Sequence, residues 1–264
     1  MMQENKKFKL VSAKKTRYLL PNILTLAGVC LGISSIKFSI DGNFTLAVTL
    51  ILIAAILDAL DGRIARLIKG TSDFGKELDS LTDFVSFGIA PVFILYFWEL
   101  NNYGKLGWAI TLIYSVCCVL RLARFNLTKI SDTEDWKNNF FEGIPSPAGG
   151  LLILMPLIYE LANINIGFEI KKITPFLTIL IAILLVSKIP TLALKKISTT
   201  PKTSVFLLLG IGIVFIALLF YTLEALLIFG ICYLISIPVS IIIYNNYNKK
   251  NSEKISEDNR EDIL

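Results

Sequence analysis

The chain has 264 residues, of which 54% are hydrophobic and only 18% are charged, so it is too apolar for a water-soluble protein of this length. Histidine is absent, which excludes Ser-His-Asp and Cys-His nucleophile systems and every histidine-ligated metal site. The formal net charge of +5 is explained by basic residues that orient the chain and attract anionic lipid headgroups, so we expect no nucleic-acid partner. The composition predicts an all-α integral membrane protein.

Eight apolar stretches are predicted as membrane-spanning helices, because a helix needs roughly 20 apolar residues to cross the hydrocarbon core of a bilayer. We expect a basic N-terminal segment at 1–18, a membrane-embedded domain at 19–247 and a disordered tail at 248–264. The predicted spans are 19–39, 44–67, 80–99, 106–125, 147–164, 173–190, 204–222 and 225–247.

The basic residues predict the orientation of the chain in the membrane. Most of the 26 lysines and arginines lie in the N-terminal segment, the C-terminal tail and every second connection between predicted spans. The positive-inside rule places such segments in the cytoplasm. We therefore expect a multi-pass protein of the cell (inner) membrane, with both termini and the connection between the second and third spans on the cytoplasmic side.

Four aspartates interrupt the apolar pattern around that connection. Asp58 and Asp61 are three residues apart on the predicted second helix, and Asp79 and Asp83 are four apart on the third, so each pair projects from one helical face. A short turn makes the two helices antiparallel neighbours and brings the four carboxylates together. Four anions beside hydrocarbon need counter-charge. Oxygen ligands without Cys or His favour one or two Mg²⁺ or Mn²⁺ ions over zinc.

Aspartates within apolar helices can also have roles that involve no metal ion. A single intramembrane aspartate is often a helix–helix hydrogen bond or a proton relay, and one pair at helical spacing can be a solvated helix end. Two pairs on two linked helices favour a ligand instead. Three small residues nearby, Gly62, Ala65 and Gly75, would let a ligand or another backbone approach closely.

The chain resembles the CDP-alcohol phosphatidyltransferase family, whose signature it matches without a departure. The resemblance implies a helical membrane enzyme with the fold of that family, usually a homodimer. Such an enzyme moves a phosphatidyl group from a CDP-linked lipid to an alcohol and releases CMP, so that 19–247 would be the catalytic domain. The matching positions are Asp58, Asp61, Gly62, Ala65, Arg66, Gly75, Asp79 and Asp83.

The roles of family residues carry over by position. The resemblance implies that Asp58, Asp61, Asp79 and Asp83 ligate two metal ions and that Asp83 is also the general base. Without the resemblance, the segment PNILT at 21–25 would be interpreted as supplying a helix cap and an interfacial hydroxyl. The residues implied to bind CDP-diacylglycerol are Asn22, Thr25, Gly62, Arg66, Ser72 and Gly75.

Four flanking segments are similar to those of the bacterial and archaeal membrane-embedded members that use serine. They are FVSFGIAP at 84–91, LRLARFN at 120–126, FEGIPSPAGG at 141–150 and VSKIPTLALKK at 186–196. The resemblance implies transfer from CDP-diacylglycerol to L-serine, giving phosphatidylserine and CMP. The carboxylate of serine needs a cation. The candidates are Arg121, Arg124 and Lys188, for each of which the alternative role is a snorkelling anchor at a helix end.

Rival functions are compatible with parts of this pattern. The acceptor of the same reaction can be glycerol phosphate, inositol phosphate or choline, because the pair Arg121 and Arg124 does not exclude a sugar phosphate. A cation-coupled transporter would place its aspartates near the midplane between repeated halves, whereas these lie on the predicted cytoplasmic side and the sequence has no internal repeat. A structural membrane scaffold would leave the clustered carboxylates without a purpose.

Overall fold

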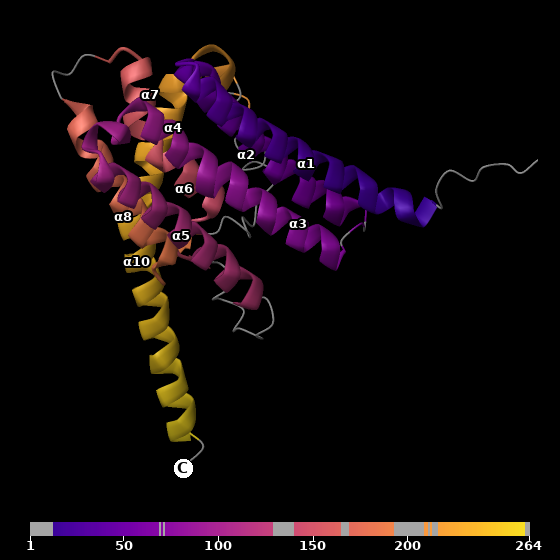
Figure 1. Ribbon diagram of the computed structural model, residues 1–264. Helices are drawn as coiled ribbons and strands as arrows, with labels where there is room; N and C mark the ends of the chain where they lie inside the picture. Colours follow the sequence, from indigo (N-terminus) through magenta and orange to yellow (C-terminus); the bar gives the residue numbers. More distant parts are fainter. Residues whose placement is uncertain are drawn as a thin grey trace, which may run out of the picture.

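The computed structural model describes residues 13–68, 70, 72–128, 140–164, 169–192, 209–210, 212 and 216–261, and this part of the chain is almost entirely helical (Figure 1). The predicted all-α class is confirmed. The helices are α1 (Ala13–Ile40), α2 (Phe44–Leu67), α3 (Asp73–Asp83), the π-helix η1 (Phe84–Ile89), α4 (Ala90–Trp98), the 3₁₀ turn η2 (Leu100–Tyr103), α5 (Lys105–Thr128), α6 (Ser146–Ile153), α7 (Met155–Leu161), the 3₁₀ turn η4 (Ile170–Ile173), α8 (Thr174–Val186) and α10 (Thr222–Glu261).

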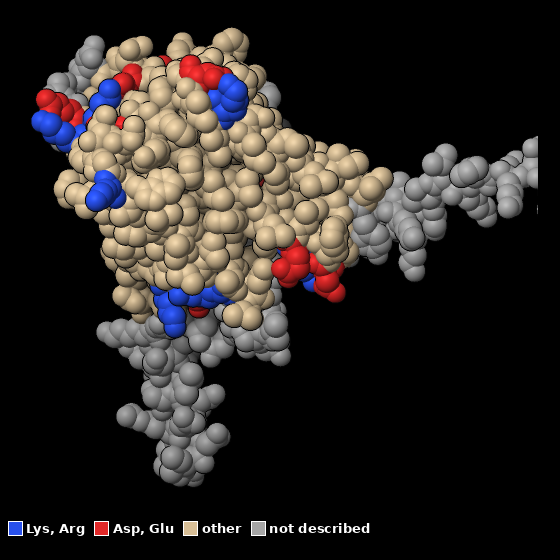
Figure 2. Space-filling view, viewed as in Figure 1, with Lys and Arg blue, Asp and Glu red and all other residues tan. Residues whose placement is uncertain are grey.

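Five helical runs among the described residues are long and apolar enough to cross a membrane. They correspond to the first four predicted spans and the last one, and the third joins α3, η1 and α4 without a break. Most charged side chains on the face shown in Figure 2 lie toward its two ends, as expected for a chain that crosses a bilayer. The chain is therefore a multi-pass membrane protein. The five runs are Leu19–Ile40, Phe44–Leu67, Asp73–Trp98, Lys105–Leu127 and Thr222–Asn245.

The predicted count of eight spans is not confirmed. The fifth predicted span, 147–164, is divided into α6 and α7, because Pro156 lacks the N–H that would continue the helical hydrogen bonds past Leu154. The sixth, 173–190, is largely the 13-residue α8, and part of the seventh, 204–222, lies outside the described residues. All three short helices carry buried residues, so their apolar sequence reflects packing inside the bundle.

The C-terminal segment also differs from the expectation. Helix α10 continues to Glu261 and projects beyond the bundle, as the yellow helix in Figure 1 shows, whereas we expected disorder from residue 248. Extending an existing helix adds one hydrogen bond per residue and needs no new nucleus. The apolar first half of α10 therefore supports a helical backbone in the polar second half.

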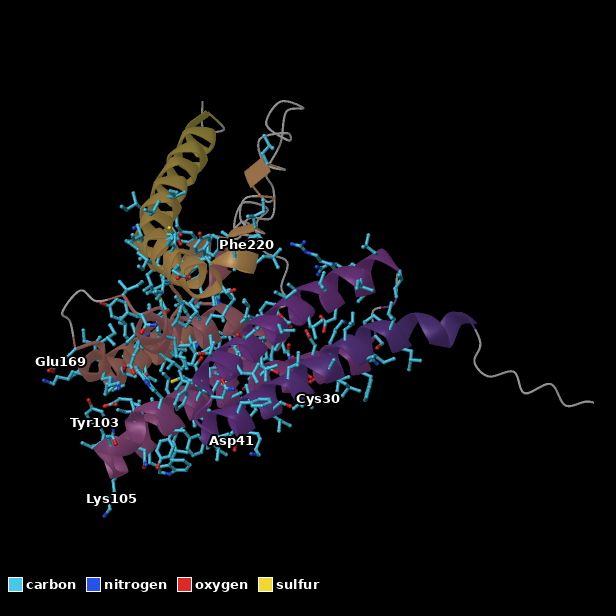
Figure 3. All side chains as sticks on the ribbon, turned by 90° about the horizontal axis from the view of Figure 1, so that it is seen from above. Cys30, Asp41, Tyr103, Lys105, Glu169 and Phe220 are labelled. Carbon is cyan, nitrogen blue, oxygen red and sulfur yellow. The ribbon has the colours of Figure 1, made fainter. Side chains whose placement is uncertain are left out.

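Alternate connections lie on one side of the bundle. The connections marked by Asp41, by Tyr103 and Lys105, and by Glu169 gather on the same side in Figure 3. These connections follow α1, α4 and α7, so the connection between α2 and α3, which carries the aspartate motif, lies at the other end of its helices. This arrangement agrees with the alternation that we expected from the basic residues.

A short two-stranded ladder ties the start of α6 to the end of α8. Strand β1 (Phe140–Glu142) pairs antiparallel with β2 (Pro190–Leu192). Gly143 follows β1 with a φ of 72° and donates its N–H to the carbonyl of Ile189 at 2.8 Å. A Cβ at Gly143 would lie 2.8 Å from the carbonyl oxygen of Ser187, so this position requires glycine. The ladder fixes where α6 begins.

Helix α1 approaches η1 closely at two glycines spaced four residues apart. The hydroxyl of Ser86 donates to the carbonyl of Gly28 at 3.1 Å. A Cβ added at Gly32 would lie 2.9 Å from Ser86 Oγ and 3.0 Å from Ser86 Cα. Small residues at such a spacing let two membrane helices pack backbone to backbone. This contact holds α1 against the segment that directly follows Asp83.

Replacing Gly32 with alanine is expected to destabilise the protein by about 1–3 kcal/mol, the usual cost of overpacking a tight contact. The backbone of Ser86 must shift to admit the methyl group. Thermal unfolding of the purified protein in detergent measures the effect. Gly62→Ala is the matched control for stability, because a Cβ at Gly62 meets nothing within 4 Å. Equal melting temperatures for the two variants would contradict the role given to Gly32.

Candidate metal centre and active site

Helices α2 and α3 bring three aspartates together. One carboxylate oxygen from each of Asp58, Asp61 and Asp79 lies within 4.8 Å of the others, so a single cation can contact all three. The hydroxyl of Ser72 caps α3 by accepting a hydrogen bond from the N–H of Gly75 at 3.0 Å. This cap starts α3 immediately after the short turn. The helical spacing of the two pairs then points their carboxylates toward each other.

Asp83 stands at the edge of this cluster. Its carboxyl lies close enough to that of Asp58 for a hydrogen bond when one of them is protonated, but it is not among the three that converge within 4.8 Å. Asp83 Oδ2 accepts a hydrogen bond from Ser146 Oγ at 3.1 Å. Its other oxygen, Oδ1, is buried without a hydrogen-bond partner among the described residues. Asp83 thus faces the cluster, and its Oδ1 can accept a further hydrogen bond.

Ser146 connects Asp83 to a buried cation. Arg121 Nη1 donates to Ser146 Oγ at 2.6 Å, and the guanidinium lies over the ring of Phe125, 5.6 Å from its centroid. The serine is fully buried at the first residue of α6. We did not single out Ser146 from the sequence, where the only signal was a hydroxyl between two prolines ahead of an apolar helix.

The structure separates the three cationic candidates for the acceptor carboxylate. Arg121 lies beside Asp83. Arg124, one turn further along α5, donates from Nη1 to the carbonyl of Val186 at 2.6 Å, and it therefore compensates the C-terminal end of α8. The side chain of Lys188 is exposed. Of the three, Arg121 is the one for which the described residues show a position beside the aspartates.

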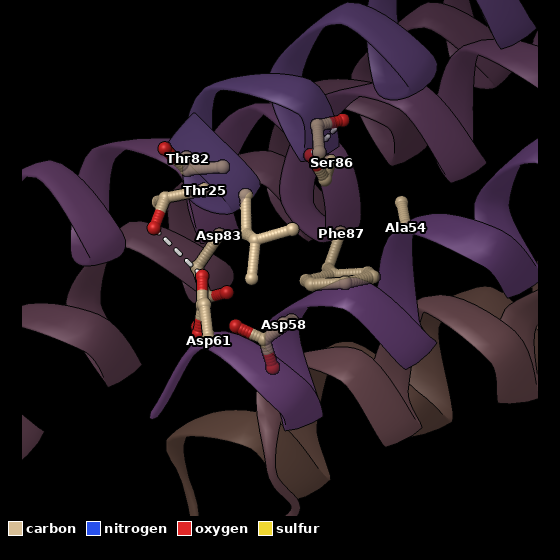
Figure 4. A pocket seen from close by; sticks show the side chains of 10 residues that line it. Thr25, Ala54, Asp58, Asp61, Thr82, Asp83, Ser86 and Phe87 are labelled. Atoms are coloured by element: carbon tan, nitrogen blue, oxygen red, sulfur yellow. Dashed lines mark hydrogen bonds between the residues drawn. The ribbon is translucent and has the colours of Figure 1, made fainter. Parts of the chain in front are cut away.

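The candidates for nucleotide contact lie along α1, α2 and the start of α3. Thr25 Oγ1 donates to Asp61 Oδ2 at 2.7 Å (Figure 4), which orients a member of the cluster. A Cβ at Gly75 would lie 3.2 Å from Asn22 Oδ1, so the first half of α1 contacts the start of α3 there. Gly62 has open space beside it, and the side chain of Arg66 is exposed.

A cleft between α1, α2, α3 and η1 opens beside the carboxylates (Figure 4). Asp58, Asp61 and Asp83 line one part of it. The hydroxyl-bearing residues Thr25, Thr82 and Ser86 and apolar side chains such as Leu24 and Phe87 line the rest. Such a cleft has both a polar and an apolar wall, which suits a ligand with a charged group next to hydrocarbon.

The π-helix η1 places the residues after Asp83. A π-helix leaves backbone carbonyls without their usual α-helical partners, and such segments are often found at functional sites. Here Tyr114 donates its hydroxyl proton to the carbonyl of Phe87 at 3.0 Å, and Ser115 donates to that of Gly88 at 3.3 Å. Helix α5 therefore holds the widened turn in place and, through Arg121, also reaches Asp83.

Known proteins share the part of the chain that forms this site. Residues 18–187, which include all four aspartates, Arg121 and Ser146, match the family model described as CDP-alcohol phosphatidyltransferase. A CDP-diacylglycerol–serine O-phosphatidyltransferase of Helicobacter pylori is 35% identical over 236 residues, covering 87% of this chain and 96% of the relative. Proteins with the same name are 35% identical over 227 residues in Mycobacterium leprae (84% and 74% covered) and 34% identical over 149 residues in Bacillus subtilis (56% and 81%).

Proposed function

Because the chain belongs to the CDP-alcohol phosphatidyltransferase family, we propose that it transfers the phosphatidyl group of CDP-diacylglycerol to L-serine, giving phosphatidylserine and CMP. The observation that carries the proposal is the cluster of Asp58, Asp61 and Asp79 with Asp83 at its edge. The names of the relatives support serine as the acceptor.

The donor set of the cluster fits hard divalent cations. It consists of carboxylate oxygens from Asp58, Asp61 and Asp79, with the unpaired Oδ1 of Asp83 nearby, and such ligands favour Mg²⁺ or Mn²⁺. We propose two ions, held by these four residues. When bound, such ions neutralise the charge of a pyrophosphate and stabilise the departing CMP. Thr25 would keep the Asp61 carboxylate in position for them.

Asp83 is proposed as the general base. The bond between the serine oxygen and the phosphatidyl phosphorus forms as the bond from that phosphorus to CMP breaks, and the hydroxyl proton passes to Asp83 and then to solvent. The hydrogen bond from Ser146 occupies Oδ2, which leaves Oδ1 to accept the proton. Arg121, tied to Ser146, keeps positive charge next to this carboxylate.

The remaining family positions are proposed to hold the nucleotide. Arg66 supplies a fixed cation for phosphate, and the open space at Gly62 lets a ligand approach the backbone of α2. Asn22, Ser72 and Gly75 meet where the first half of α1 contacts the start of α3. Their contacts with one another support a shared surface for CDP.

The proposal also covers the side of the membrane on which the site lies and the oligomeric state of the protein. We place the site on the cytoplasmic side of the inner membrane, because basic residues flank the connection between α2 and α3. We also propose a homodimer as the assembly, in keeping with the family resemblance.

Arg121→Ala is expected to raise the KM for serine by roughly 10- to 150-fold, which corresponds to a lost charge-assisted hydrogen bond of about 1.5–3 kcal/mol. The KM for CDP-diacylglycerol should change much less. Arg121→Lys should recover only part of the loss, because an ammonium cannot reproduce the planar fork of a guanidinium. Arg124→Ala is the matched comparison: it removes the bond to Val186, so we expect a lower melting temperature with a nearly normal KM for serine. A normal KM for serine in Arg121→Ala, together with a raised KM for serine in Arg124→Ala, would assign the serine carboxylate to Arg124 instead.

An acceptor panel tests the proposed reaction. The purified protein in detergent is given CDP-diacylglycerol with L-serine, glycerol phosphate, inositol phosphate or choline, and CMP release is followed. We expect release that depends on serine and little stimulation by the other alcohols. Stimulation by a sugar phosphate alone would keep the enzyme class and change the acceptor. No CMP release with any alcohol would contradict the enzyme proposal and return attention to a cation transporter.

A further inference from the structure

Three buried side-chain polar atoms have no hydrogen-bond partner within the part of the chain that the structure describes, and they belong to one neighbourhood. They are Asp83 Oδ1, Arg121 Nε and the hydroxyl of Tyr233. Arg121 lies close enough to both Asp83 and Tyr233 for direct electrostatic interaction. Buried polar atoms are nearly always paired in folded proteins. Three unpaired ones from α3, α5 and α10 in a single place indicate a site for a polar ligand.

The proposed function already uses the first of these atoms, and the other two are both hydrogen-bond donors. The guanidinium of Arg121 is fixed by its bond to Ser146 and by the ring of Phe125, which leaves its Nε–H without an acceptor. The Tyr233 hydroxyl lies beside that of Thr191 but makes no hydrogen bond of normal geometry. Thr191 gives its own proton to the carbonyl of Gly143 at 2.8 Å.

Two unpaired donors in the same buried neighbourhood suit an anionic group with two oxygens. A carboxylate accepts from a guanidinium N–H and a phenol O–H at the same time. We infer that Arg121 and Tyr233 together bind the carboxylate of the acceptor amino acid and thereby orient its hydroxyl toward Asp83. This inference rests on the proposed function, and it makes Tyr233 a residue that selects the acceptor.

The charge at the site favours a carboxylate over a phosphate. One guanidinium and one neutral phenol match a group with a single negative charge, whereas a phosphate monoester carries nearly two. Of the other cationic candidates, Arg124 is bonded to α8 and Lys188 is exposed. The site therefore matches serine better than a sugar phosphate.

Tyr233 comes from a different part of the chain than the carboxylate cluster. The family match ends at residue 187, whereas Tyr233 lies on α10, which packs against β2 and α7. The shared portion of the chain holds the aspartates and Arg121, and α10 adds the second donor. Acceptor choice in this chain is thus set jointly by α5 and α10.

Tyr233→Phe tests the inference, because it removes one oxygen and keeps the ring. We expect the KM for serine to rise about tenfold or more, as for loss of a hydrogen bond to a charged group, while the KM for CDP-diacylglycerol changes less than about twofold. Ethanolamine has the hydroxyl and the amine of serine but no carboxylate. Its inhibition constant against serine should be the same in the variant and the wild type. The matched control is Tyr221→Phe, since Tyr221 is 66% exposed.

Two results would overturn the assignment of Tyr233. One is a normal KM for serine in Tyr233→Phe, and the other is an equal loss of affinity for serine and ethanolamine. Either result, in a protein whose wild type uses serine, removes the Tyr233 contact and leaves the proposed reaction intact. A wild-type protein whose CMP release does not respond to serine would instead overturn the proposed function itself.

Discussion

Replacing Asp83 with asparagine is expected to lower the rate of phosphatidyl transfer by about 10²- to 10⁴-fold, the usual contribution of a positioned general base. The carboxamide keeps the shape of the side chain and can still accept the hydrogen bond from Ser146, but it cannot take the proton of the serine hydroxyl. Single-turnover measurements of CMP release at saturating serine measure the loss.

Binding of CDP-diacylglycerol should survive in the Asp83→Asn variant, because Asp58, Asp61 and Asp79 remain. Asp73→Asn is the matched control, since the side chain of Asp73 is 99% exposed and paired with Lys76, and we expect it to keep the wild-type rate. A normal rate in Asp83→Asn would mean that another group is the base.

Removing divalent cations is expected to abolish activity completely. All the proposed ligands are oxygens, so excess EDTA should stop CMP release, and Mg²⁺ or Mn²⁺ should restore it. A zinc-selective chelator should have no effect. Asp79→Asn should raise the metal concentration that gives half of the maximal rate, because it removes one of the three converging carboxylates. Full turnover in excess EDTA would contradict the metal centre.

The carboxylate cluster could be predicted from the sequence because its geometry is largely local. Spacings of three and four residues place Asp58 with Asp61, and Asp79 with Asp83, on single helical faces. Both helices pack against α1, and the short turn between them keeps their carboxylates close enough to converge. Three of the four predicted ligands converge within 4.8 Å, and Asp83 contacts the group through Asp58.

The part of the site around Arg121 could not be predicted, because it depends on tertiary packing. Ser146 lies 63 residues from Asp83 along the chain and reaches it only because the β1–β2 ladder and Gly143 fix the start of α6. Arg121 and Arg124 are both basic residues at the end of one helix and look equivalent in the sequence. The position of α6 beside the first and of α8 beside the second gives them different partners.

The predicted count of eight spans was not confirmed for a related reason. Hydropathy identifies residues that avoid water, but it does not distinguish helices facing lipid from helices buried inside the bundle. Helices α6, α7 and α8 are apolar because residues such as Leu152, Leu157 and Ile181 are buried in the core. The π-helix after Asp83 could not be predicted either. The hydrogen bonds to two of its carbonyls come from Tyr114 and Ser115 on α5, which are distant in the sequence.

The most direct measurement is the mass balance of the reaction catalysed by the purified protein. Radiolabelled L-serine and CDP-diacylglycerol are incubated with Mn²⁺ or Mg²⁺, and labelled lipid and free CMP are quantified together. We expect labelled phosphatidylserine and CMP in equal amounts, and neither product from Asp79→Asn at the metal concentration that saturates the wild type. CMP without labelled lipid, or labelled lipid formed equally by wild type and Asp79→Asn, would contradict serine transfer at the aspartate cluster.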